Sequence, residues 1–214
     1  RVPDSVLDVA CGTGAHLAAI APRVTRVAGV DLHPGMLAAA RRRLPVTRLE
    51  QCDMRRMALG ERFDLVSCLF AATGYLPDEP ALTEAIGAMA EHLAPGGVLV
   101  VEPPLRPRDL SPPATQHDRI LRGDRTLHRR TTARLVDEVL EIRFACWSAA
   151  DTGDAASGPA PGPPPEARTE VHRIRLFSDA AFDAAFAAAG LSHEPQQSDA
   201  PPRRLLVARA GGDQ

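Results

Sequence analysis

The sequence predicts an α/β fold in which a doubly wound, mostly parallel sheet of seven strands is joined by an antiparallel sheet that covers the ligand site. Strand-like apolar runs alternate with helix-like runs over residues 1–102, as in chains that form parallel sheets. The first apolar run enters a glycine-rich turn and continues as an Ala/Leu-rich helix. Beyond residue 102, prolines precede several runs of strand character.

Composition narrows the class of protein. The chain has 214 residues, which is enough for one domain with a substantial core, and 44% of them are hydrophobic. No apolar run approaches the length of a bilayer crossing, so we expect no membrane partner. A net charge of −2 gives no general attraction to nucleic acid. The cysteines are widely spaced and predict reduced thiols in a cytoplasmic protein, without a metal site: Cys11, Cys52, Cys68 and Cys146.

The first half of the chain supplies most of the predicted sheet. Proline or glycine follows several of the helix-like runs and ends them. The run from residue 63 to residue 70 is apolar enough to be a central strand buried on both faces. The first predicted strand begins at Ser5, and the others cover residues 26–31, 46–50, 63–70 and 98–102. The predicted helices cover residues 14–21, residues 38–44 after an opening at Pro34-Gly35-Met36, and residues 79–93.

The second half predicts the covering sheet and the end of the core sheet. Residues 125–134, 136–148 and 169–177 alternate as antiparallel strands, and residues 151–166 are a Pro-, Gly- and Ala-rich loop that we expect to be mobile. Ser178 begins a helix over 179–189, and residues 191–194 and 204–209 form a final strand pair. The predicted divisions are therefore 1–102, a substrate-covering insertion at 103–177, and 178–214, which completes the core sheet.

The opening turn indicates a nucleoside-type cofactor. Gly12 and Gly14 allow a ligand to approach the backbone, and Asp31 closes the next strand, where a carboxylate can accept two hydrogen bonds from a ribose diol. Leu17 stands where the NAD fingerprint has its third glycine, which disfavours an NAD-dependent oxidoreductase. Asp8 suits a ligand with an amino-acid end. From Leu7 to Gly14 the sequence resembles the first motif of the class I S-adenosylmethionine (SAM) methyltransferases.

This resemblance implies which residues contact SAM. Asp53 follows a strand and would accept from the adenine amine, while Met54 would lie against the purine face. By itself, Asp53-Met54 could equally be a turn residue followed by a core methionine. The implied cofactor-binding residues are Asp8, Ala10, Cys11, Gly12, Gly14, Asp31, Leu32, Met36, Asp53, Met54 and Leu69.

Later segments resemble a narrower group, the bacterial N,N-dimethyltransferases that act on nucleotide-linked amino sugars in macrolide-type antibiotic pathways. The likeness rests on Cys52 to Arg55, Gly74 to Leu76 and His172 to Phe177. It implies methyl transfer to a sugar amine, with Tyr75 as the catalytic residue beside the acceptor nitrogen. Tyr75, His172 and Arg203 are the implied substrate-binding residues. Arginines in the predicted covering sheet suit phosphate oxygens as a group, although any one of them is better explained by a solvated strand face: Arg119, Arg122, Arg125, Arg129 and Arg130.

Two alternatives stay open on the sequence alone. Pro103-Pro104 stands where the resembled enzymes carry an aromatic pair, so the acceptor could be another small metabolite, methylated on oxygen or nitrogen. The chain could also bind SAM without catalysis. Enzymes of this group carry a helical segment ahead of the first strand, whereas this sequence begins at Arg1, a few residues before it. The expected partner is a small-molecule substrate, and the resemblance is compatible with a homodimer.

Overall fold

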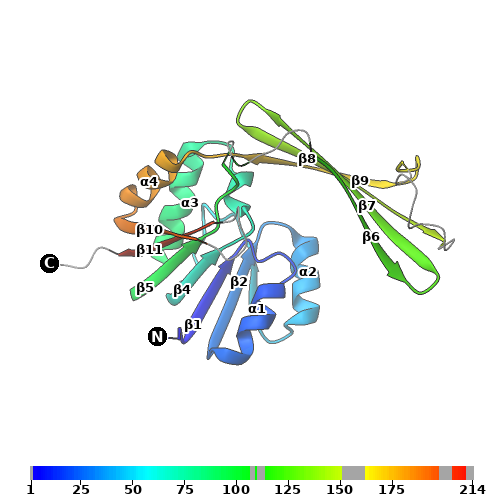
Figure 1. Cartoon of the computed structure of the whole chain (residues 1–214). Helices are drawn as coiled ribbons and strands as arrows, with labels where there is room; N and C mark the ends of the chain where they lie inside the picture. Colours follow the sequence, from blue (N-terminus) through cyan, green and yellow to red (C-terminus); the bar gives the residue numbers. More distant parts are fainter. Residues whose placement is uncertain (1, 107–108, 110–113, 151–161, 198–203, 211–214) are drawn as a thin grey trace. The chain divides into compact units, whose positions relative to one another are not determined.

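The chain divides into two compact units. The structure, a computed structural model, describes residues 2–106, 109, 114–150, 162–197 and 204–210. We call Arg1–Arg106 with Phe177–Gln214 the core unit, and Pro107–Leu176 the sheet unit. Figure 1 shows the elements of each unit along the chain. Each unit is described by itself below.

The described residues of the core unit form a seven-stranded mixed sheet, as predicted. Its strand order is β10-β11-β5-β4-β1-β2-β3. Strands β1 to β5 pair in parallel, and β11 is antiparallel to both of its neighbours. The order reverses between β1 and β4, and ligands of open α/β sheets bind outside the carboxyl ends of the strands at such a point. The strands are β1 (Ser5–Val9), β2 (Arg26–Asp31), β3 (Arg48–Gln51), β4 (Phe63–Cys68), β5 (Leu93–Val101), β10 (Leu191–Gln197) and β11 (Arg204–Ala210).

Helices lie on both faces of this sheet (Figure 1). Leu17 of α1 and Leu37 of α2 belong to one buried cluster, whereas Leu82 of α3 and Phe182 of α4 belong to another. The helices are α1 (Ala15–Ile20), α2 (Pro34–Arg43), α3 (Glu79–Glu91) and α4 (Asp179–Ala188), with 3₁₀ turns η1 (Ala21–Arg23) and η2 (Ala72–Tyr75). In the described ranges, none of the helices combines the length and hydropathy needed to cross a bilayer.

Side-chain caps explain where α2 and α4 begin. Ser178 caps α4 as predicted, because its Oγ accepts from the Ala181 N–H at 3.1 Å. The second helix begins at Pro34, as predicted from the Pro34-Gly35-Met36 opening, and the His33 imidazole Nδ1 caps it by accepting from the amides of the first turn, 3.0 Å from the Gly35 nitrogen. A histidine cap carries no strong sequence signal.

Leu93 was predicted as the last core residue of a helix, and that prediction is wrong. The structure places it at the start of β5, where it pairs with Phe63 before a shift in register. The shift needs glycine: a Cβ on Gly97 would lie 2.8 Å from the Ala94 carbonyl oxygen and 2.9 Å from that of Phe63. The Pro-Gly-Gly segment is thus an irregularity within the strand.

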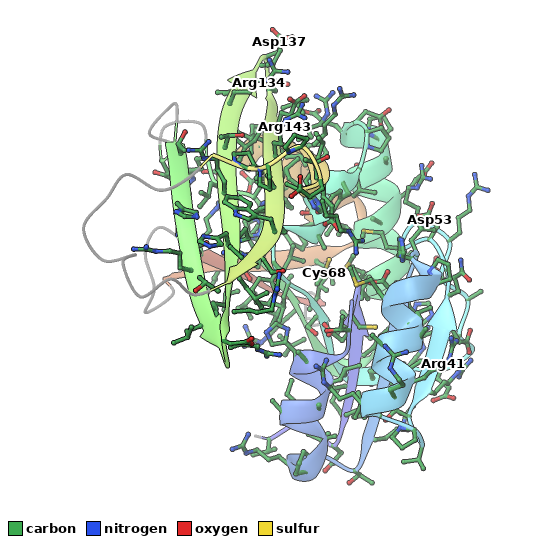
Figure 2. All side chains as sticks on the ribbon, turned by 90° about the vertical axis from the view of Figure 1, so that its right-hand side faces the viewer. Arg41, Asp53, Cys68, Arg134, Asp137 and Arg143 are labelled. Carbon is green, nitrogen blue, oxygen red and sulfur yellow. The ribbon has the colours of Figure 1, made fainter. Side chains whose placement is uncertain are left out.

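The sheet unit is a four-stranded antiparallel sheet in the order β6-β7-β8-β9. Three strands were predicted and four are present, because β6 was missed. Asp137, with φ at 55°, lies in the turn after β7 and marks the tip of a hairpin (Figure 2), so Val136 ends β7 and does not begin the next strand. The strands are β6 (Ala114–Arg122), β7 (Arg125–Val136), β8 (Val139–Ala150) and β9 (Arg168–Arg175). The placement of this sheet over the ligand site stays a prediction.

Candidate active site

The glycine-rich turn leaves the carboxyl end of β1 with tightly specified backbone bonds. The Cys11 N–H donates to the Val30 carbonyl, and the Gly14 N–H donates to the Cys11 carbonyl, each at 2.9 Å. Gly12 adopts φ of 55°, a left-handed conformation that favours glycine. A Cβ on Gly12 would meet no atom within 4 Å. The backbone is therefore open to a ligand at this position.

Asp31 is held against this turn at the end of β2. Its Oδ2 accepts from the Gly12 N–H and its Oδ1 accepts from the His33 N–H, both at 2.8 Å. Each carboxylate oxygen has a second lone pair, so the side chain can still accept from hydroxyl groups. Leu32 and Met36 follow at the same strand end, and their side chains are exposed. The predicted ribose site is therefore assembled from adjacent segments.

Asp8 is a buried carboxyl at the carboxyl end of β1. It is 4% exposed, and Ser67 Oγ on β4 donates to its Oδ1 at 2.8 Å. Burial raises the pKa of Asp8 from 3.8 to about 6, although the Ser67 hydrogen bond and the nearby His16 imidazole lower it. A bound ammonium group would stabilise the ionised form. Asp8 is thus suited to a ligand with a cationic end.

Asp53 lies beyond the carboxyl end of β3, as predicted, but its carboxylate already has a partner. Arg55 Nη2 donates to Oδ2 at 2.6 Å, and Arg55 Nε lies 3.1 Å from both oxygens. This ion pair, which the sequence analysis missed, holds the pKa of Asp53 below its usual value. An adenine amine would have to share the carboxylate with Arg55. Met54 is half-buried against the main core cluster.

The segment after β4 is strained and carries Tyr75. Phe70 and Ala71 adopt φ of 55° and 58°, which non-glycine residues rarely do, and η2 follows directly. Tyr75 ends η2, and its side chain is 56% exposed. Partial burial raises the pKa of Tyr75 above its usual value, so its hydroxyl stays protonated at neutral pH.

The core unit brings together most of the predicted cofactor residues and Tyr75 at the carboxyl ends of four neighbouring parallel strands. Cys11 and Cys68 are buried there as thiols, and burial raises the pKa of Cys11 to about 12 (Figure 2 labels Cys68 and Asp53). Leu69, directly after β4, is half-buried. His172 instead lies on β9 of the sheet unit, where its ring meets the Phe144 ring edge-on at 5.3 Å. Arg203 lies outside the described residues.

Three residues at this edge were not identified from the sequence. Ser67 bonds Asp8, the His16 ring stacks on the Phe70 ring with centroids 4.7 Å apart, and Glu102 bonds the Phe70 amide. The signal for Glu102 was its position at the carboxyl end of the predicted fifth strand, because parallel strands end at one edge. Among the described residues, no group of three or more His, Cys, Asp or Glu side chains is placed to hold a metal ion.

Comparisons with known proteins identify the family of this chain. A family model described as a methyltransferase domain matches residues 6–97. The dTDP-3-amino-3,4,6-trideoxy-alpha-D-glucopyranose N,N-dimethyltransferase of Streptomyces venezuelae is 37% identical over 211 residues, which cover 97% of this chain and 84% of that relative. The chain belongs to the SAM-dependent methyltransferase family. The methyltransferase is also similar, at 37% identity, to the dTDP-3-amino-3,6-dideoxy-alpha-D-glucopyranose N,N-dimethyltransferase of Streptomyces fradiae over 97% of this chain and 77% of the relative.

Solved structures give the same answer for fold and cofactor. SAM-bound CalS10, an amino pentose methyltransferase from Micromonospora echinaspora, has a TM-score of 0.83 at 37% identity and covers 96% of this methyltransferase and 83% of that chain. The cofactor of the methyltransferase is SAM. The open backbone at Gly12, the fixed Asp31 carboxylate and the buried Asp8 carboxyl fit the nucleoside and amino-acid ends of that molecule.

Proposed function

We propose that the methyltransferase N-methylates the amino group of a nucleotide-linked amino sugar in bacterial secondary metabolism. The observation that carries the proposal is its 37% identity, over 97% of the chain, to a relative named as a dTDP-amino sugar N,N-dimethyltransferase. The match extends beyond the cofactor half of the chain. It therefore also covers the second half, whereas two relatives named as trans-aconitate 2-methyltransferases match less than half of the chain.

The chain's own residues have distinct parts in this reaction. Asp31 would hold the ribose, Asp8 would face the amino-acid end, and Asp53 with Met54 would meet the adenine. The other proposed cofactor contacts are Ala10, Cys11, Gly12, Gly14, Leu32, Met36 and Leu69. Bound SAM supplies an electrophilic methyl group: the amine lone pair forms the new N–C bond, the C–S bond breaks toward sulfur, and S-adenosylhomocysteine and a proton are released.

Orientation of the amine is the main task left to the protein, because a neutral amine needs little activation. The Tyr75 hydroxyl is protonated at neutral pH and can accept a hydrogen bond from the amine N–H. It would hold the nitrogen lone pair toward the methyl carbon at about 3 Å, the distance of a near-attack geometry. His172 and Arg203 complete the proposed substrate contacts, and the insertion at 103–177 is the proposed substrate cover.

Assembly and location are part of the proposal. Ile120 on β6 pairs with Leu127 on β7, and both side chains are exposed, which supports a homodimer that buries this face. Light scattering after size-exclusion chromatography would test it, and a monomer mass at micromolar concentration would contradict it. All four cysteines are free, which supports a cytoplasmic location.

The substrate proposal is tested by incubating the protein and SAM with a panel of nucleotide-linked amino sugars and, separately, other small amines, alcohols and acids. Mass spectrometry should detect the gain of one or two methyl groups on an amino sugar nucleotide. Methylation of another metabolite alone would replace the proposed substrate class. Binding of S-adenosylhomocysteine without methylation of any panel member would favour a SAM-binding protein without catalysis.

A further inference from the structure

Strained backbone gathers at one edge of the core sheet. Among the described non-glycine residues, four have positive φ, and three of them lie at carboxyl ends of central strands: Ala10 after β1, and Phe70 and Ala71 after β4. Such conformations are unfavourable for residues with a Cβ and persist only where surrounding contacts impose them. The contacts that impose this backbone at Phe70 can be identified.

Glu102 bridges the ends of β4 and β5. Its backbone N–H donates to the Cys68 carbonyl oxygen, and its side-chain Oε2 accepts from the Phe70 N–H, both at 2.9 Å. One residue thus binds the last residue of β4 and the first strained residue of the turn. A bond from a carboxylate to a backbone N–H is charge-assisted and stronger than a bond between neutral groups.

The Phe70 side chain reaches the cofactor turn. Its ring stacks on that of His16 with an interplanar angle of 19°, and His16 lies in α1 immediately after the glycine-rich turn. The Phe70 side chain is nevertheless 57% exposed. The strained turn therefore contacts the cofactor side through Phe70 and leads directly into η2, which ends at Tyr75.

We propose that Glu102 is a positioning residue for methyl transfer, which holds the Phe70–Ala71 turn in its left-handed form and so sets Tyr75 and the Phe70–His16 stack relative to the cofactor turn. This inference rests on the proposed function for the identity of the acceptor. Glu102 itself touches the backbone of Phe70 and acts on the reaction through that contact. Without it, the turn is expected to relax toward the ordinary backbone regions and displace the start of η2.

The experiment compares Glu102→Ala, Glu102→Asp and Glu102→Gln, with Glu91→Ala as a control on an exposed glutamate at the end of α3. Glutamine keeps a carbonyl oxygen at the same reach, whereas aspartate is one methylene too short. We expect kcat to fall about tenfold or more in Glu102→Ala and Glu102→Asp, because displacement of a positioning group by about 1 Å can cost a hundredfold. Glu102→Gln and the control should stay within about threefold of the wild-type kcat.

Two further measurements separate positioning from loss of structure. Hydrogen exchange of the Phe70 amide should accelerate about tenfold or more in Glu102→Ala but not in Glu102→Gln, while exchange at Val66 in the buried strand stays unchanged. The KM for SAM and the calorimetric Kd for S-adenosylhomocysteine should change by less than about threefold in every variant. If Glu102→Ala fails to fold, Glu102→Asp provides the same comparison.

The outcomes are distinguishable. Unchanged Phe70 exchange in Glu102→Ala, or accelerated exchange with unchanged kcat, would overturn the role of Glu102. If the wild-type protein methylates none of the amino sugar nucleotides, the proposed function fails, and any acceptor found in the same panel serves for the kcat comparison. The exchange result then still decides whether Glu102 holds the turn.

Discussion

Replacing Asp8 by asparagine removes a buried charge at the carboxyl end of β1 without changing the size of the side chain. Asp8 is 4% exposed, and its Oδ1 accepts from Ser67 Oγ at 2.8 Å. The amide oxygen of asparagine can accept the same bond. The variant therefore isolates the cost of ionising this carboxyl inside the folded protein.

The magnitude follows from the pKa of Asp8, which burial raises from 3.8 to about 6. Because the folded state binds this proton more tightly than the unfolded chain, wild-type stability falls as pH rises from about 4 to about 6. Full ionisation costs about 3 kcal/mol, of which about 2 kcal/mol develops between about pH 4.5 and about pH 7.5. Above the folded pKa the cost is constant.

Urea unfolding of both proteins across this pH range measures the effect. The free energy of unfolding of Asp8→Asn, minus that of the wild type, should rise by about 2 kcal/mol from about pH 4.5 to about pH 7.5. Taking the difference removes the contribution of groups that do not interact with Asp8. A difference that is constant across this range would refute the inference that burial perturbs Asp8.

Cofactor binding should show the opposite trend with pH. At about pH 5 only about one wild-type molecule in ten has Asp8 ionised, so S-adenosylhomocysteine should bind about tenfold more weakly than at pH 7.5. Asp8→Asn should bind it weakly at both pH values. 5′-Methylthioadenosine, which lacks the ammonium group, is the control and should show little change. Equal pH dependence for the two ligands would contradict a contact between Asp8 and the amino-acid end.

Three other substitutions test separate parts of the site. Asp31→Ala removes the carboxylate that accepts from the Gly12 and His33 amides and should weaken S-adenosylhomocysteine binding about tenfold or more by calorimetry; unchanged affinity would exclude the ribose role. Tyr75→Phe should lower kcat for the amino sugar nucleotide without changing the melting temperature, and unaltered turnover would remove Tyr75 from the mechanism. Gly29→Ala should destabilise the fold by about 1–3 kcal/mol, because the new Cβ would lie 2.7 Å from Leu17 Cδ1, whereas Gly87→Ala, with open space at its Cβ, should not.

Local signals were sufficient for most of the core unit. The glycine-rich turn, the acid that closes β2 and the serine cap of α4 each follow from the chemistry of a few adjacent residues. The carboxyl ends of parallel strands lie at one edge of a sheet. Predicting the strands of the first half of the chain was therefore enough to predict that the residues after them lie close together. The placement of Asp31 against Gly12 is the clearest example.

The features that sequence reasoning missed depend on contacts between distant segments or on weak local patterns. β6 has polar residues on both faces, and its main signal was the two-residue turn Gly123-Asp124, where Gly123 has φ of 60°. Phe70 and Ala71, the left-handed pair after β4, include no glycine that would mark them in the sequence. The Phe70 amide is instead bonded by Glu102, some thirty residues later, and a contact over that separation leaves no local signal. The Arg55–Asp53 ion pair depends on how the chain turns after β3, which the residue types alone do not specify.

The most direct test of the account is the mass spectrum of a dTDP-linked amino sugar after incubation with this protein and SAM. We expect a product that carries one or two additional methyl groups on nitrogen, together with stoichiometric S-adenosylhomocysteine, and less of both with the Asp31→Ala variant at the same subsaturating SAM concentration. An unmodified sugar nucleotide, from a protein shown by calorimetry to bind S-adenosylhomocysteine, would contradict the proposed amino sugar substrate.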